Sequence, residues 1–139
     1  MLAKRIYRDF LSSGDTLRIY AEGRLVFTSA RDRLSAILDY LEKGAGTGPP
    51  VTVMDRVVGR AAALLAIRAG CREIYSPLGS RLAEEALDEQ GVAHFFDAVV
   101  PHIRNAAGTD ICPMEKLSLG KNPEQFYALM KAKMTGAAP

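Results

Sequence analysis

Two short stretches of the sequence carry residue types that could do chemistry. The first begins at Asp55, where a short apolar run over residues 51–54 gives way to a helical pattern. The second begins at Cys112, which precedes Pro113 and stands three residues before Glu115. Carboxylates can act as general acids or bases, and a thiol can act as a nucleophile. Asp55, Cys112 and Glu115 are therefore the candidate catalytic residues.

The Asp55 stretch is predicted to place a carboxylate between a buried strand and a helix over residues 56–69. The carboxyl ends of strands in open α/β sheets border ligand crevices. Aspartate also suits the N-cap of a helix, where its oxygen accepts a bond from an amide of the first turn. Asp55 thus fits both a ligand-binding role and a role as a cap alone.

Three residues that follow Asp55 are unusual for the start of a buried helix. A glycine inside a helix, as predicted for Gly59, costs about 1 kcal/mol relative to alanine unless a neighbour or ligand packs on the bare backbone. Arg56 and Arg60 lie one turn apart and oppose the helix dipole, so an anion or carboxylate is expected beside them. We predict all three as ligand-binding residues. The alternative is that both arginines reach solvent and that Gly59 only lets another helix approach.

The Cys112 stretch has the spacing of a capping box over residues 112–115, with sulfur in place of the usual hydroxyl. A cysteine at a helix start can have a lowered pKa and be a better nucleophile. The alternative is an inert, partly buried thiol beside a cap. His102, Asn105 and Lys116 flank this stretch and join the ligand-binding candidates.

The sequence shows neither a zinc motif nor a phosphate loop. Cys112 and Glu115 form one weak pair of ligands, whereas zinc sites usually need several closely spaced Cys and His residues. No glycine-rich loop precedes a lysine and a hydroxyl residue, and no Gly-x-Ser-x-Gly elbow is present. We therefore predict no metal and no cofactor.

The size and composition predict one globular domain over residues 1–139. The formal net charge of +2 is dispersed along the chain, which favours neither a nucleic-acid nor a membrane partner. The first residues lack the pattern of a secretory signal, and no apolar run is long enough to cross a bilayer. The two cysteines, Cys71 and Cys112, are then expected to be reduced thiols of a cytoplasmic protein.

The hydrophobic pattern predicts an α/β fold, in which a hairpin precedes alternating strands and helices. Because such alternation needs crossover connections, the later strands should be parallel, with helices on both faces of a mixed five-stranded sheet. The expected strands cover 16–21, 24–28, 51–54, a segment from Glu73 to Pro77, and 94–101. The expected helices cover 2–12, a segment after Ser29 that ends at Gly44, 56–69, about 79–90, a piece after Cys112, and about 122–134.

Two signatures resemble a small bacterial family of unknown function with a cytidine-deaminase-like fold. They are Asp-Arg-Val-Val-Gly-Arg-Ala-Ala-Ala at residues 55–63 and Cys-Pro-Met-Glu at residues 112–115. The resemblance implies a three-layer α/β/α sandwich, with a deaminase-like core over about 14–118. Zinc deaminases carry a zinc ligand and a catalytic Glu at one helix start and a Pro-Cys-x-x-Cys pair at the next. Residues 29–32 and 54–57 hold neither motif, so the implied pocket is independent of zinc.

The residues and the resemblance together favour a small-molecule enzyme or binding protein, with a site between the helix starts at Asp55 and Cys112. A nucleotide-like ligand follows from fold analogy alone. The alternative is a non-catalytic regulatory or structural module that forms a homodimer or docks on a larger enzyme. Either an amphipathic N-terminal helix or a sheet edge would mediate that docking. Whether the chain is an enzyme, and on what substrate, stays open at this point.

Overall fold

The computed structural model describes residues 2–32, 34–44 and 48–134, so parts of the predicted domain over 1–139 lie outside the described residues. Within them a mixed β-sheet is combined with helices, as the sequence pattern predicts. The elements in chain order are α1 (Leu2–Ser12), β1 (Leu17–Ala21), β2 (Arg24–Ser29), α2 (Ser35–Glu42), β3 (Val51–Asp55), β4 (Val57–Val58), α3 (Arg60–Arg68), β5 (Cys71–Ser80), α4 (Arg81–Glu89), β6 (Ala93–Val100), α5 (Pro113–Ser118) and α6 (Pro123–Met134).

The sheet has six strands among the described residues, one more than expected. From one edge the order is β2-β1-β3-β5-β6, with β1 antiparallel to β2 and β3, and with β3 and β6 parallel to β5. The additional strand, β4, pairs with the same side of β5 as β3 does. Strands β3 and β4 are therefore one line of chain, interrupted at Arg56.

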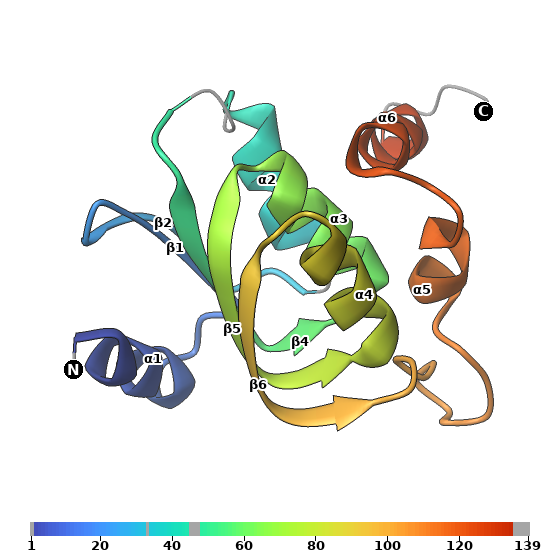
Figure 1. The fold of residues 1–139 in the computed structure, drawn as a ribbon, viewed down its shortest axis with the longest axis horizontal. Helices are drawn as coiled ribbons and strands as arrows, with labels where there is room; N and C mark the ends of the chain where they lie inside the picture. Colours follow the sequence, from blue (N-terminus) through green and yellow to red (C-terminus); the bar gives the residue numbers. More distant parts are fainter. Residues whose placement is uncertain (1, 33, 45–47, 135–139) are drawn as a thin grey trace.

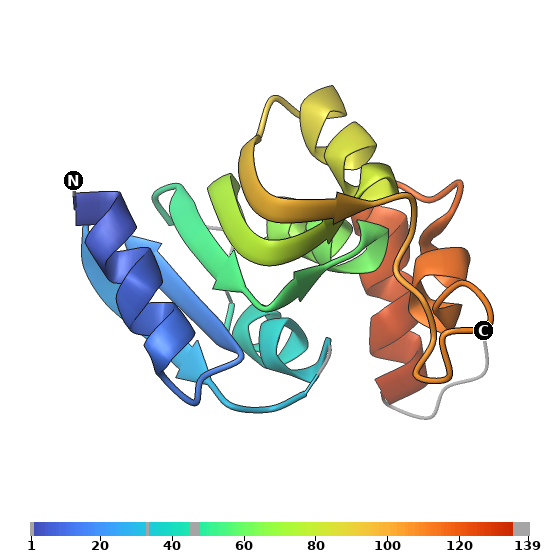
Figure 2. The same cartoon turned by 90° about the horizontal axis from the view of Figure 1, so that it is seen from below.

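The helices lie on both faces of the sheet, but unequally. Helix α1 covers part of one face, and α2, α3 and α4 cover the other, with α5 and α6 outside α3 (Figures 1 and 2). Phe10 of α1 is fully buried, and the ring of Tyr7 lies 5.7 Å from that of Tyr75 in the sheet. The apolar side of the N-terminal helix thus packs on the sheet. Docking of a partner through α1 stays a prediction, for the side of the helix that is exposed.

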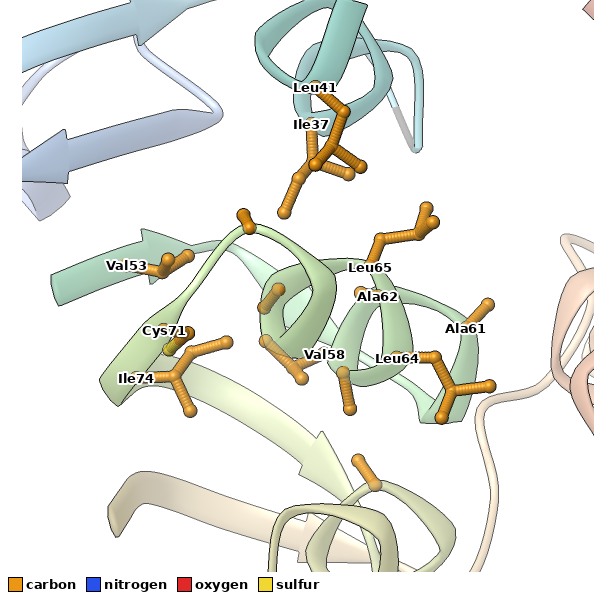
Figure 3. Close-up of a cluster of buried hydrophobic side chains, with 14 of the residues drawn as sticks. Ile37, Leu41, Val53, Val58, Ala61, Ala62, Leu64, Leu65, Cys71 and Ile74 are labelled. Carbon is orange, nitrogen blue, oxygen red and sulfur yellow. The ribbon is translucent and has the colours of Figure 1, made fainter. Parts of the chain in front are cut away.

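The main core lies between the sheet and helices α2, α3 and α4 (Figure 3). Helix α3 is buried over most of its length, because it has the sheet on one side and α4, α5 and α6 around it. Its alanines suit this place, since small side chains let neighbouring helices and strands approach closely. The side chains drawn in Figure 3 include Val53 and Ile74 from the sheet, Leu64 and Leu65 from α3, and Ile37 from α2.

The starts of two helices differ from the sequence prediction. Helix α3 begins at Arg60 and not at residue 56, because the β-branched pair Val57 and Val58 continues the strand and Gly59, in extended backbone, is the N-cap. The second helix was expected directly after Ser29 and begins only at Ser35. The predicted cap at Asn122 is present: Asn122 and Gln125 exchange bonds of 2.8 and 3.0 Å between side chain and backbone.

None of the helices in the described part of the chain is both long and apolar enough to span a membrane.

Candidate functional site

Asp55 lies at the carboxyl end of β3, at the point where the strand is interrupted. Its carboxylate Oδ1 accepts a bond of 2.8 Å from the amide of Arg56. Burial nevertheless raises the pKa of the Asp55 carboxyl to about 7. Backbone hydrogen bonds from Arg56 and Val57 lower this pKa, but by less than burial raises it. A carboxyl group with such a pKa can both take up and release a proton near neutral pH.

A cavity of about 470 Å³ opens at this end of the sheet, a volume that suits a small ligand. It lies between the start of α3, the chain that follows β2 and the loop that leads into α5. Apolar side chains form much of its wall: Leu34, Val57, Ala61, Ala62, Ile103 and Met114. Its polar lining residues include Thr16, Asp32, Asp55, Arg104, Cys112 and Glu115.

Glu115 contributes to this wall but is committed to the protein backbone. The residue is only 1% exposed, and its carboxylate accepts bonds from the amide of Arg60 and, at 2.7 Å, from the amide of Ile103. Glu115 therefore caps α3 from a distant part of the chain. The expected capping box with Cys112 was wrong, because the side chain of Glu115 points to α3 and not back along α5.

Gly59 is explained by the same contact. A Cβ atom at this position would lie 2.9 Å from Oε1 of Glu115 and 3.0 Å from Cγ1 of Ile103. The bare backbone therefore admits a carboxylate of the protein itself. The sequence prediction placed a glycine inside a helix with a helix or ligand against it, whereas the glycine precedes the helix and its neighbour is a side chain.

The two arginines that the sequence singled out are bound to carbonyl groups. The guanidinium of Arg56 donates to the carbonyl oxygens of four residues at the end of α1, which are Phe10, Leu11, Ser13 and Asp15. These bonds use four of its five N–H groups. The guanidinium of Arg60 turns away from the cavity and donates to the carbonyls of Ser118 and Lys121. Both side chains thus hold the fold together in this structure.

Cys112 places a half-buried thiol in the cavity wall. Its backbone amide donates to the carbonyl of Ile103 over 2.7 Å, which fixes the start of α5 beside the loop, and its sulfur makes no capping bond. Cys71 lies in the core, where burial raises the pKa of its thiol to about 12. Only the Cys112 thiol is therefore placed to meet a ligand in this cavity.

The remaining candidates lie around the cavity and not in its wall. Asn105 accepts a bond from the amide of Thr109 and so shapes the loop before α5. His102 is half-buried and Lys116 is exposed, and neither side chain belongs to the cavity lining. The structure therefore separates these three residues from Asp55.

Three polar lining residues were not among the sequence candidates. Arg104 comes from the loop before α5, and Thr16 and Asp32 flank the hairpin of β1 and β2. Antiparallel pairing of β1 with β3 sets Leu17 opposite Asp55, which brings Thr16 to the cavity. The local pattern around Thr16 and Asp32 indicates only a strand start and a helix cap, so no sequence signal marked them.

Two other possibilities, a metal site and a second cavity, were compared with the Asp55 cavity. Within 2–32, 34–44 and 48–134, no group of three or more His, Cys, Asp or Glu side chains is placed to hold a metal ion. Another cavity, of about 490 Å³, lies at the opposite end of β3, where the carboxylate of Glu73 accepts a bond from the hydroxyl of Thr52. The Asp55 cavity is the better candidate, because it lies at the carboxyl end of β3, a strand parallel to β5, and contains a carboxyl of perturbed pKa.

Comparison with known proteins places the chain in a family. The sequence model of the TM1506 family, described as a domain of unknown function (DUF1893), matches residues 6–134. A crystal structure of a DUF1893 family protein (TM1506) from Thermotoga maritima at 2.70 Å resolution is similar, with a TM-score of 0.84 and 26% sequence identity. The match covers 95% of this chain and 89% of that chain. No curated protein matches this chain. The chain therefore belongs to the DUF1893 family, whose function is unknown.

Proposed function

We propose that this chain binds a small molecule in the cavity beside Asp55 and that the Asp55 carboxyl exchanges a proton with the bound molecule. Cys112 supplies a thiol in the wall of the same cavity. Glu115, which the sequence also offered as a catalytic residue, acts as the structural cap of α3. The proposal requires neither a metal nor a cofactor.

The observation that carries this proposal is the environment of Asp55. Its carboxyl is desolvated at the edge of a ligand-sized cavity, and the groups that hydrogen-bond to it are backbone amides next to it in sequence. Desolvation without a compensating charge is a common arrangement for a general acid or base, because it brings the pKa close to neutral pH.

The wider expectations belong to the same proposal. A single domain with a cytidine-deaminase-like core is supported by the mixed sheet with helices on both faces, and that likeness favours a ligand with a nucleobase-like part. A reducing cytoplasm suits the two free thiols. Neither a nucleic acid nor a membrane is part of the proposed function.

A thermal-shift screen tests the proposal with nucleosides, amines, small acids and divalent metals. A ligand at a hundred times its dissociation constant adds about 2.7 kcal/mol, which raises the melting temperature by a few degrees. We expect a stabilising compound whose effect disappears in Asp55→Asn. The same compound should also slow the alkylation of Cys112 by iodoacetamide. The reactivity of the buried Cys71 should not change.

The matched control is Asp9→Asn, which removes a carboxylate from the exposed side of α1. A ligand of the Asp55 cavity keeps its full effect in this variant. A screen without any hit, or a hit that Asp55→Asn leaves unchanged, would contradict the proposal.

A second function, a docking or dimerisation module, is favoured by the edges of the sheet. Large apolar side chains are exposed on both edge strands: Leu25 and Val26 on β2, and Phe95 and Val99 on β6. The outer edge of such a strand can pair with a strand of another chain. The molar mass in solution, measured by light scattering beside the ligand screen, separates a homodimer without ligand from a ligand-binding monomer.

A further inference from the structure

Carboxyl groups outnumber guanidinium groups among the residues that line the Asp55 cavity. The carboxylates of Asp55, Asp32 and Glu115 line it, and the two arginines among its lining residues are Arg56 and Arg104. The Arg56 guanidinium is committed to the carbonyls that end α1 and stacks on the ring of Phe10, with its carbon 4.6 Å from the ring centroid. Arg104, which is exposed, brings the other positive charge.

The start of α3 is already occupied by a carboxylate. A helix start attracts anions because it combines amide donors with the positive end of the helix dipole. Here the Glu115 carboxylate takes that place and bonds to the amide of Arg60. An anionic ligand would therefore approach Glu115 as well as Asp55, and the repulsion would oppose its binding.

The opposite charge fits the cavity. A carboxylate accepts hydrogen bonds and donates none once it is ionised. Bonds from a charged nitrogen to a carboxylate are shorter and stronger than bonds between neutral groups. The cavity wall also includes apolar side chains, among them Val57, Ala62 and Met114.

We propose that the ligand of this cavity is a small organic cation, an amine or an amidine with an apolar body, whose charged nitrogen binds the Asp55 carboxylate. The apolar body packs against Val57, Ala62 and Met114. This inference rests on the proposed function, because it names the ligand class of the same site. The raised pKa of Asp55 is compatible with it, since a cation beside the carboxyl favours the ionised form.

Three probes of one shape and different charge test this inference: benzamidine, benzamide and benzoate. Binding to the full chain is measured at millimolar concentrations from shifts in amide NMR spectra. Bonds to charged groups contribute roughly 1.4 kcal/mol more than neutral ones, so benzamidine should bind roughly tenfold more tightly than benzamide, and benzoate most weakly.

Substitution of Asp55 is the decisive arm of the experiment. In Asp55→Asn the affinities for benzamidine and benzamide should lie within about threefold of each other, because the charged acceptor is lost. Asp32→Asn, an exposed position that tolerates the change without risk to the core, should weaken benzamidine by a smaller factor. Asp9→Asn, on α1, should leave all three affinities unchanged.

The outcomes separate the ligand class from the proposed function. If benzoate bound most tightly and lost affinity in Asp55→Asn, the ligand class would be wrong while the binding function stood. If benzamidine bound equally well to the wild type and to both carboxylate variants, the ligand class would also be wrong. If no probe shifted the lining residues and the broad screen gave no hit, both proposals would fail.

Discussion

Two carboxylates of one cavity, those of Glu115 and Asp55, have opposite surroundings. Glu115 is almost fully buried and accepts bonds from two amides that are distant from it in sequence. Asp55 is partly buried and accepts from amides next to it in the chain. The first arrangement ties α3, α5 and the loop between β6 and α5 together. The second leaves an acceptor for a ligand.

The contrast shows that a carboxylate does not have a functional role merely because it lines a cavity. Bonds that join separate parts of the chain stabilise the fold, whereas desolvation without such bonds raises the pKa and costs stability. If this distinction is right, removal of Glu115 should harm folding. Neutralisation of Asp55 should instead change the response to pH and ligands.

The largest effect is expected for Glu115→Ala. This change leaves the amides of Arg60 and Ile103 buried without their charged acceptor, at about 2 kcal/mol for each bond, and should lower the free energy of unfolding by about 4 kcal/mol. Urea denaturation measures it. Glu89→Ala, at an exposed position near the end of α4, is the control and should change stability by less than about 0.5 kcal/mol. Equal losses in the two variants would show that Glu115 is not a structural cap.

A smaller effect is expected for Gly59→Ala, because the new Cβ would lie 2.9 Å from Oε1 of Glu115. Overpacking of this kind costs about 2 kcal/mol. The control is Gly14→Ala, where a Cβ would meet no atom within 4 Å. In the Glu115→Ala background the cost of Gly59→Ala should fall, since the clashing carboxylate is gone. An unchanged cost in that background would contradict the contact.

The smallest effect, counted as the change in the free energy of unfolding per pH unit, is expected for the pH dependence that Asp55 contributes. Its folded pKa of about 7 lies above the unfolded value of about 3.9. Between these values the folded chain holds a proton that the unfolded chain has lost, so this contribution is complete below about pH 4 and is lost as the pH rises to about 7. The slope should be about 1 kcal/mol per pH unit and be absent in Asp55→Asn. Asp9→Asn is the control and should keep the slope of the wild type. If Asp55→Asn also kept the slope of unfolding free energy against pH, Asp55 would have an ordinary pKa.

Much of the fold could be predicted from local patterns. The hairpin, the alternation of strands and helices and the cap at Asn122 depend on residues that are neighbours in sequence, and local spacing reveals such features. The interruption of the strand at Arg56 could not be read in this way. Val57 and Val58 fit a buried helix as well as a strand, and the choice between them depends on pairing with the distant residues Leu78 and Gly79.

The candidate site was predictable in its position but not in its roles. Asp55 and Cys112 could be expected at one cavity, which both of them line, because strand ends and helix starts have recognisable residue types. The roles of Glu115 and Arg56 depend on partners far along the chain, at Arg60 and around Phe10. Thr16 reaches the cavity through the pairing of β1 with β3, and Asp32 follows β2, which pairs with β1. Such long-range contacts leave no mark on spacing or composition.

The Asp55 carboxyl is expected to stay protonated close to neutral pH, because burial desolvates it. The most direct test is an NMR titration of the side-chain carboxyl carbons of the full chain, with Asp55 assigned by its absence from Asp55→Asn. We expect a transition near pH 7 for Asp55. A transition at the ordinary value of about 4 would contradict it and would leave Asp55 as another structural carboxylate.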